Sequence, residues 1–207
     1  MIDAIKEAVL EGDRSRVVDL TTAALESGAG PKEILDQALT PAMDIVGEEY
    51  ERGDRYVPEM LISAEAMKGA MRQLKPLLAD AGVEPRGRVV IGTVEGDLHD
   101  IGKDLVSMML EGAGFEVTDL GVEVTAAAFV EAVREGGPDI VAMSALLTTT
   151  MTNMPVVIGS LREAGLRDRV KVIVGGAPVT QAFAEEIGAD GYAADAAGAA
   201  KLAASLT

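Results

Sequence analysis

The chemistry of this chain centres on its single histidine. His99 lies in the segment Glu-Gly-Asp-Leu-His-Asp-Ile-Gly at positions 95–102, between an apolar run and a helical pattern. The chain has no cysteine, so the protein alone cannot supply a metal site that needs several nitrogen or sulfur ligands. His99 can still complete the coordination of a metal whose other ligands come from a cofactor. Asp97, two residues earlier, is close enough to hold the second nitrogen of the imidazole ring.

A purely structural role is the alternative for the same residues. A lone histidine often packs in or caps a turn, and Asp97 would then be the N-cap of the following helix. Gly96 and Gly102 suit a tight turn and would also let a bulky ligand approach the backbone.

Two later loops are expected at the same edge of the structure. In a parallel sheet, ligands bind beyond the carboxyl ends of the strands, and the His99 turn follows the first expected strand. A hydroxyl-rich loop, 144–150, follows the third strand, and Gly175-Gly176 follows the fourth. Singly, serine and threonine cap helices and a glycine pair forms a turn. Together the three loops indicate a binding site, with the glycine pair leaving a slot for a large, flat ligand.

Residues 1 to about 80 have only helical patterns. Their apolar spacing predicts a helix from Ile2, a second up to Gly28, a third from Pro31 that Pro41 bends or divides, and a long one over 56–78. The methionines on the long helix, Met60, Met67 and Met71, are expected in the core. The polar stretch 79–87 is the best linker. We therefore predict a four-helix bundle over 1–85 and a second domain over 86–207.

From Arg88 onward, short β-branched runs alternate with helical patterns. The strands are expected near 89–91, 115–117, 140–143, 170–174 and 191–193, and the helices near 102–113, 125–135, 151–164, 180–187 and from Asp195. This alternation predicts an α/β fold, a doubly wound parallel sheet of five strands in flavodoxin-like order. The first turn is neither a G-x-G-x-x-G dinucleotide motif nor a P-loop, and there is no G-x-S-x-G elbow. The third strand ends in Ser144, where a phospho-receiver domain would need an aspartate.

The composition limits the partners. Eighteen basic and 34 acidic residues give a formal net charge of −16, which opposes binding to nucleic acid or an anionic membrane. No run approaches the roughly 20 apolar residues of a membrane span. We expect a cytoplasmic protein whose partners are basic protein surfaces or neutral small molecules.

Three motifs together resemble a known signature. Asp97-x-His99-x-x-Gly102, then 41 residues, Ser144-x-Leu146, then 28 residues, and Gly175-Gly176 are similar to the cobalamin-binding signature shared by methionine synthase and the corrinoid proteins of methyltransferase systems. The preceding helices resemble the cap domain of those proteins. The length of the chain resembles the corrinoid proteins more than methionine synthase.

The resemblance implies specific roles. His99 would be the lower axial ligand of cobalt, with Asp97 and the Thr150 hydroxyl as a relay behind it; methionine synthase has serine where Thr150 stands. The other residues implied in cofactor binding are Asp100, Gly102, Ser144, Leu146, Thr148, Gly175 and Gly176, with the nucleotide tail of the cofactor passing Ser144 and Thr148. Tyr50 and Val57 align with cap positions that shield the upper face of cobalt, and ordinary bundle packing is their alternative.

The resemblance also implies a function. The chain would bind a corrinoid (cobalamin) and carry a methyl group between a substrate-specific methyltransferase and a second methyltransferase acting on tetrahydrofolate or coenzyme M, with a reductive activator as a further partner. One alternative is a cobalamin-dependent sensor without methyl transfer, and another is a flavodoxin-like interaction domain without a corrin.

Overall fold

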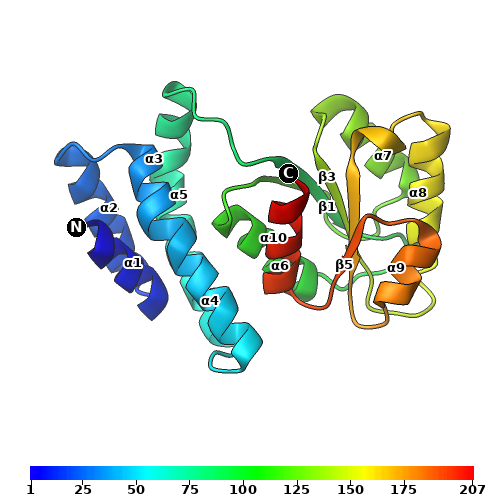
Figure 1. Ribbon diagram of the computed structural model, residues 1–207, viewed down its shortest axis with the longest axis horizontal. Helices are drawn as coiled ribbons and strands as arrows, with labels where there is room; N and C mark the ends of the chain where they lie inside the picture. The colour runs from blue at the N-terminus through cyan, green and yellow to red at the C-terminus, as the bar shows by residue number, and fades with distance from the viewer. The chain divides into compact units, whose positions relative to one another are not determined.

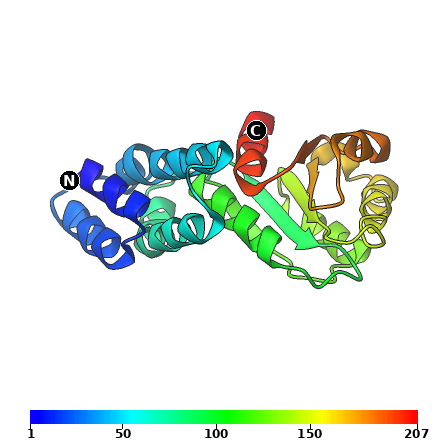
Figure 2. The ribbon, with the colours of Figure 1, turned by 90° about the horizontal axis from the view of Figure 1, so that it is seen from below.

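The computed structural model describes residues 1–207 and divides them into two units. One comprises Met1–Pro85 with Gly112–Gly114, and the other comprises Arg86–Glu111 with Phe115–Thr207. The first unit is helical, and the second is built on a β-sheet (Figures 1 and 2).

The helical unit forms from amphipathic segments separated by glycine and polar turns. Its elements are α1 (Ile2–Glu11), α2 (Arg14–Glu26), α3 (Pro31–Ile34), the π-helical turn η1 (Leu35–Leu39), α4 (Thr40–Arg52) and α5 (Val57–Asp80). Gly12, with φ of 72°, ends α1, and the Asp13 carboxylate accepts a hydrogen bond from Arg16 N–H to cap α2. Met60 and Met67 on α5 are buried, as predicted, whereas Met71 is half-buried.

Pro41 neither divides nor ends the third helix. The chain is helical without a break from Pro31 to Arg52, because a π-helical turn precedes the proline. In this turn the Thr40 N–H bonds to the Leu35 carbonyl, five residues earlier. Pro41 has no N–H, and in a regular α-helix its ring would clash with the carbonyl of Gln37. A wider turn in front of the proline avoids this clash and keeps the helix continuous.

The second unit is a parallel sheet whose strand order is that of flavodoxin, as predicted. The order is β2-β1-β3-β4-β5. The strands are β1 (Arg88–Thr93), β2 (Glu116–Asp119), β3 (Ile140–Ser144), β4 (Lys171–Gly175) and β5 (Gly191–Ala193), and the helices are α6 (Ile101–Gly112), α7 (Ala126–Gly136), α8 (Asn153–Glu163), the short η2 (Arg167–Arg169), α9 (Gln181–Ile187) and α10 (Ala196–Leu206). Thr93, Ser144 and Gly175 are register partners at the ends of β1, β3 and β4. The loops that follow these three strands therefore share one edge of the sheet.

Helices cover both faces of the sheet. Figure 1 shows α7, α8 and α9 on one face and α6 and α10 on the other, and Figure 2 agrees. Valines of the central strands and the fully buried Phe129 of α7 form a continuous hydrophobic core on the first face. A Cβ atom on Gly92 of β1 would lie 2.9 Å from the ring of Phe129, so glycine at this position lets α7 pack closely against the strand.

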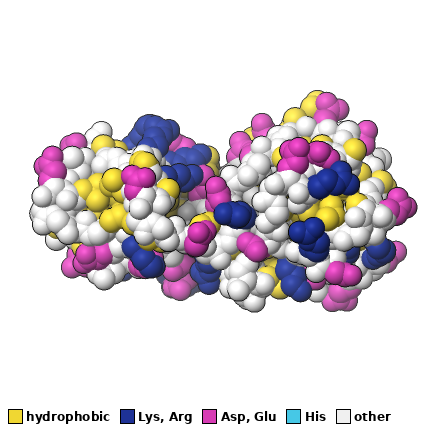
Figure 3. Space-filling view, turned by 90° about the horizontal axis from the view of Figure 1, so that it is seen from above, with side chains coloured by type: hydrophobic (Ala, Val, Ile, Leu, Met, Phe, Trp, Pro, Cys, Tyr) yellow, Lys and Arg dark blue, Asp and Glu magenta, His cyan; other side chains and the backbone are white.

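Acidic residues outnumber basic ones, 34 to 18. On the face shown in Figure 3, acidic and basic side chains are interspersed and do not form one continuous patch. None of the helices is both long and apolar enough to cross a membrane.

Candidate functional site

The loop between β1 and α6 places Asp97 directly behind the ring of His99. The Asp97 Oδ1 atom lies 2.7 Å from His99 Nδ1 and 3.1 Å from the His99 backbone nitrogen. A carboxylate can only accept hydrogen bonds, so Nδ1 carries the hydrogen and the lone pair of the neutral ring is on Nε2. Asp97 is fully buried, while the His99 side chain is 52% exposed. The pair is thus an exposed imidazole oriented by a buried carboxylate.

The second oxygen of Asp97 is held by the loop after β3. Asp97 Oδ2 accepts hydrogen bonds from the Thr150 hydroxyl at 2.6 Å and from the Leu146 N–H at 2.8 Å. Burial raises the pKa of Asp97, but the hydrogen bonds from Thr150, Leu146 and His99 lower it more, and the net pKa is well below the ordinary value of an aspartate. Asp97 is therefore an anion that cannot easily be protonated.

The structure brings Asp97, His99 and Thr150 together as the sequence predicted. The alternative role of Asp97 as an N-cap does not apply, because α6 begins only at Ile101 and both carboxylate oxygens are bonded elsewhere. The methyl group that distinguishes threonine from serine at this position lies against Gly96: a Cβ atom on Gly96 would be 3.6 Å from Thr150 Cγ2. The extra methyl therefore has room and leaves the hydroxyl on Asp97.

Exposed apolar side chains lie in the His99 loop, at the start of α6 and in the loop after β3. Leu98 is 67% exposed and Ile101 75%, and Leu146 and Leu147 on the neighbouring loop are also exposed. None of the hydrogen bonds involves His99 Nε2. No group of three or more histidine, aspartate or glutamate residues could hold a metal ion, so a metal at His99 would need its remaining ligands from a cofactor. A free imidazole nitrogen within an apolar surface fits a metal held in a large apolar macrocycle.

The glycine pair at the end of β4 lies close to the backbones of neighbouring segments. Gly176 has φ of +122°, and a Cβ atom there would lie 1.9 Å from the carbonyl oxygen of Ala145. A Cβ atom on Gly175 would lie 3.0 Å from the Ala193 carbonyl oxygen. The Ala145 backbone already occupies the space that a side chain on Gly176 would need, so the fold itself requires glycine there, whereas the space at Gly175 is only tight.

The remaining predicted residues of the sheet unit lie near the same loops. Asp100 and Gly102 are exposed at the start of α6, and no atom lies within 4 Å of where a Gly102 Cβ would be. Ser144 ends β3 and is half-buried, and Thr148 is exposed on the following loop. These four residues are therefore accessible to a ligand at this edge.

Tyr50 and Val57 belong to the helical unit. Tyr50 lies near the end of α4 and Val57 is the first residue of α5, and both are half-buried.

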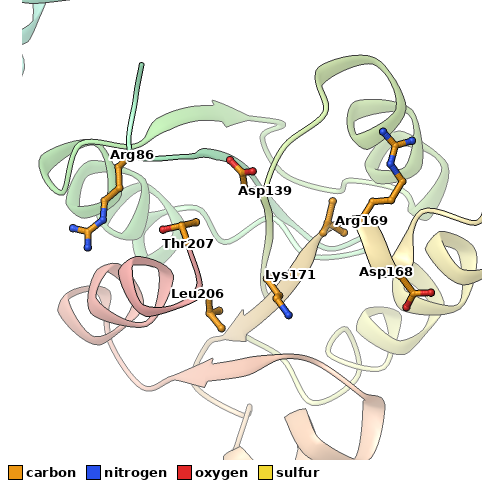
Figure 4. Close-up of a pocket in the computed structure, with 8 residues that line it drawn as sticks. Arg86, Asp139, Asp168, Arg169, Lys171, Leu206 and Thr207 are labelled. Carbon is orange, nitrogen blue, oxygen red and sulfur yellow. The ribbon is translucent and has the colours of Figure 1, made fainter. Parts of the chain in front are cut away.

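A separate hollow of about 320 Å³ lies at the opposite edge of the sheet, where the strands begin (Figure 4). Its lining is Arg86, Asp139, Asp168, Arg169, Val170, Lys171, Leu206 and Thr207. Charges of both signs line it, and some are already paired: Asp139 accepts a hydrogen bond from Arg88 N–H at 2.8 Å, and Lys171 Nζ lies 3.7 Å from an Asp190 oxygen. Unlike the His99 site, this hollow has no group of side chains directed at one reactive atom.

Sequence reasoning missed the groups that hold the backbone of the His99 loop. Thr93 donates a hydrogen bond to the His99 carbonyl, and Asn153 donates one to the Glu95 carbonyl. The N–H of Leu146, a signature residue, is a donor to Asp97. Threonine at a strand end and asparagine at a helix start are ordinary, so only the folded chain shows which carbonyls they reach.

Comparisons with known proteins identify the family of this chain. Residues 87–201 match the family model of the B12 binding domain, and residues 1–75 match a second model also described as a B12 binding domain. The chain is 45% identical over 194 residues to trimethylamine corrinoid protein 1 of Methanosarcina acetivorans, covering 93% of this chain and 90% of that protein. It is 41% identical over 206 residues to a corrinoid protein of Desulfitobacterium hafniense, covering 98% and 95%.

Solved structures similar to this chain also come from cobalamin proteins. A chain in the methanol:cobalamin methyltransferase complex of Methanosarcina barkeri matches with a TM-score of 0.87 at 34% identity, over 99% of this chain and 78% of that one. A cobalamin-binding protein of Desulfitobacterium hafniense matches with a TM-score of 0.83 at 32% identity, over 100% and 98%. This chain therefore belongs to the B12-binding family of corrinoid proteins, and its cofactor is a cobalamin or related corrinoid.

Proposed function

We propose that His99 is the axial protein ligand of the corrinoid cobalt and that Asp97 and Thr150 orient it. One observation carries this assignment: the half-exposed imidazole is bonded through Nδ1 to a buried carboxylate, which leaves Nε2 without a hydrogen-bond partner. Asp97 fixes the tautomer of the ring and makes Nε2 a stronger donor to a metal. Thr150 and the Leu146 N–H hold the carboxylate in place.

The residues around this group would hold the rest of the cofactor. Leu98, Ile101 and Leu146 offer apolar surface to the macrocycle, and the open space at Gly102 admits it close to the start of α6. We assign Asp100, Ser144 and Thr148 to its polar edges and nucleotide tail. Gly175 and Gly176 would act indirectly, by shaping the β4–α9 loop. Tyr50 and Val57 remain proposed shields of the upper face of cobalt.

We further propose that the protein is the methyl carrier of a methyltransferase system. When bound, the corrinoid supplies a cobalt centre that accepts and releases a methyl group. One partner would be a substrate-specific methyltransferase, and the other would pass the methyl group to tetrahydrofolate or coenzyme M, with a reductive activator restoring lost cobalt reactivity. The similarity to a trimethylamine corrinoid protein and to a chain of a methanol:cobalamin methyltransferase complex supports such partners. We place this system in the cytoplasm.

The spectrum of the reconstituted protein tests the ligand assignment. The protein loaded with hydroxocobalamin should show cobalt released from its own benzimidazole and bound by histidine, because His99 replaces the lower base. His99→Ala should remove the histidine signal while retaining the fold, since the ring is half-exposed. The same spectrum in wild type and His99→Ala would refute the assignment.

A transfer assay tests the carrier function. The loaded protein should accept a labelled methyl group from a methylamine or methanol in the presence of a cognate methyltransferase, and it should release the label to a second methyltransferase with its acceptor. Binding of cobalamin with no methyl exchange in either direction, combined with a light-dependent change of oligomeric state, would favour the sensor.

A further inference from the structure

The main chain of the His99 loop is anchored at three alternate carbonyls. The Glu95 carbonyl accepts a hydrogen bond from Asn153 Nδ2 at 2.7 Å, the Asp97 carbonyl from the Glu123 N–H at 3.1 Å, and the His99 carbonyl from the Thr93 hydroxyl at 3.0 Å. The segment between β1 and α6 has no regular secondary structure of its own. Its path therefore depends on these donors, which come from three different parts of the sheet unit.

Two of the three donors, Thr93 and Glu123, are themselves held by their surroundings. Thr93 is fully buried at the end of β1, and its N–H and C=O bond to the Gly121 carbonyl and the Val124 N–H of the turn between β2 and α7. Glu123 in this turn has φ of 52° and is the one non-glycine residue with positive φ. Such a conformation costs on the order of 1 kcal/mol and persists where the surroundings require it. Here it directs the Glu123 N–H to the loop.

A buried lysine that pairs with two partly exposed aspartates supports the same turn. Lys103 of α6 is 2% exposed and pairs with Asp119 at the end of β2 and with Asp104. The other oxygen of Asp119 accepts a hydrogen bond from the Gly121 N–H at 2.8 Å. The start of α6, the end of β2 and the following turn are thus joined next to the loop.

None of the three anchoring hydrogen bonds is made to the His99 ring or to the Asp97 carboxylate. They are therefore distinct from the relay of Asp97 and Thr150, which acts on side chains. An imidazole ligand must be placed to within a fraction of an ångström, and its supporting shell determines that placement.

We propose that Thr93 and Asn153, together with the Glu123 turn, are positioning residues: by holding the backbone of the His99 loop, they fix the position and orientation of the His99 imidazole. This inference rests on the proposed role of His99 as a cobalt ligand. Loss of an anchor would let the loop sample conformations in which Nε2 is displaced, so a larger share of bound cobalt would lack the histidine.

Two substitutions remove single anchors with little change of shape. Thr93→Val removes the hydroxyl and keeps the volume. Asn153→Asp turns the donor into an acceptor facing a carbonyl, yet an acidic residue in the first turn of α8 favours that helix, so α8 remains folded. Thr93→Ser restores the donor, and Thr118→Val changes an exposed threonine on β2 that lies beside Val90 in the sheet.

The test measures the ratio of histidine-bound to histidine-free cobalt by electron paramagnetic resonance of the reduced, cobalamin-loaded protein at one pH. Thr93→Val and Asn153→Asp should each lower the ratio by about 2- to 10-fold, the range for one lost hydrogen bond, and Thr93→Ser and Thr118→Val should retain it. Wild-type ratios in both Thr93→Val and Asn153→Asp would overturn the proposal.

A second measurement separates this proposal from the first. Amide hydrogen exchange of segment 96–100 in the cofactor-free protein should be several-fold faster in Thr93→Val and in Asn153→Asp than in wild type. If wild type shows no histidine on cobalt, the ligand assignment fails, and unchanged exchange in these variants would refute the anchors independently.

Discussion

Two glycine-containing loops lie at the same edge of the sheet but are held in place in different ways. In the β1–α6 loop, Gly96 adopts φ of +80° and lies in ordinary contact range of the Thr150 methyl group, and the side chains of Thr93, Asn153 and Thr150 bond the loop to its neighbours. In the β4–α9 loop, Gly176 is pressed against the backbone of Ala145. Single substitutions can remove the hydrogen bonds of the first loop one by one. In the second loop, any side chain at Gly176 would clash with the Ala145 backbone.

The largest effect should come from the tightly packed loop. Gly176→Ala combines a steric clash with Ala145 and an unfavourable φ, so the free energy of unfolding should fall by about 3 kcal/mol or more. Urea unfolding followed by circular dichroism measures this. An unfolding midpoint close to that of wild type would show that the backbone of the β4–α9 loop can shift to accept a side chain at position 176, and the contrast between the two loops would fail.

Removing the Asp97 charge should have the next largest effect. Asp97→Asn replaces charge-assisted hydrogen bonds and should lower the free energy of unfolding at pH 7 by about 2 kcal/mol. Because the native pKa of Asp97 is lowered, its stabilisation is fully present above the ordinary aspartate value of about 4. It is lost as the pH falls below that value toward the lowered native pKa.

The stability difference between wild type and Asp97→Asn should therefore shrink between pH 5 and pH 3. Urea midpoints at several pH values measure it in the cofactor-free protein. Asp168→Asn, an exposed aspartate at the opposite edge, serves as the control and should change stability by less than about 0.5 kcal/mol. A difference that does not depend on pH would contradict the low native pKa.

A smaller effect is expected from the hydroxyl on Asp97. Thr150→Val keeps the shape but leaves Asp97 Oδ2 with one donor, which should cost about 1–2 kcal/mol and weaken histidine ligation of cobalt. Thr150→Ser should lose less than about 0.5 kcal/mol, since it gives up only the methyl contact with Gly96. Equal losses in the two variants would show that the methyl contact matters more than the hydrogen bond.

The smallest effect should have the opposite sign. Gly102→Ala places a methyl group where no atom lies within 4 Å, inside α6, so the cofactor-free protein should gain up to about 1 kcal/mol. The same methyl group should weaken cobalamin binding if the macrocycle approaches α6 there. Higher stability with unchanged affinity would remove Gly102 from the binding surface.

Patterns that repeat along the sequence made the fold predictable. The alternating strands and helices after Arg88 gave the correct strand order, because short β-branched runs and right-handed crossovers leave few arrangements. Asp97 and His99 were predictable as a pair because they are only two positions apart in the sequence, and Thr150 followed from the resemblance to a known signature.

Contacts between distant backbones were not predictable. From the sequence alone, Gly176 is expected to form a turn or to leave an open slot. Only the close approach of the Ala145 backbone in the folded chain shows why glycine is needed. From the sequence alone, Pro41 is expected to bend or divide the helix. Only the π-helical turn before it shows how the helix continues. Thr93 and Asn153 have no distinctive pattern, since their acceptors are carbonyls that any residue would supply.

The widened turn at Leu35–Leu39 has a consequence for the distant Tyr50. A single π turn accommodates one residue more than the α-helix would, and each residue advances the helix by about 100°. Deleting one residue here would rotate the whole of α4, and with it the direction of the Tyr50 phenol, by about a quarter of a turn. The direction of the Tyr50 side chain therefore depends on a turn that lies more than ten residues earlier in the chain.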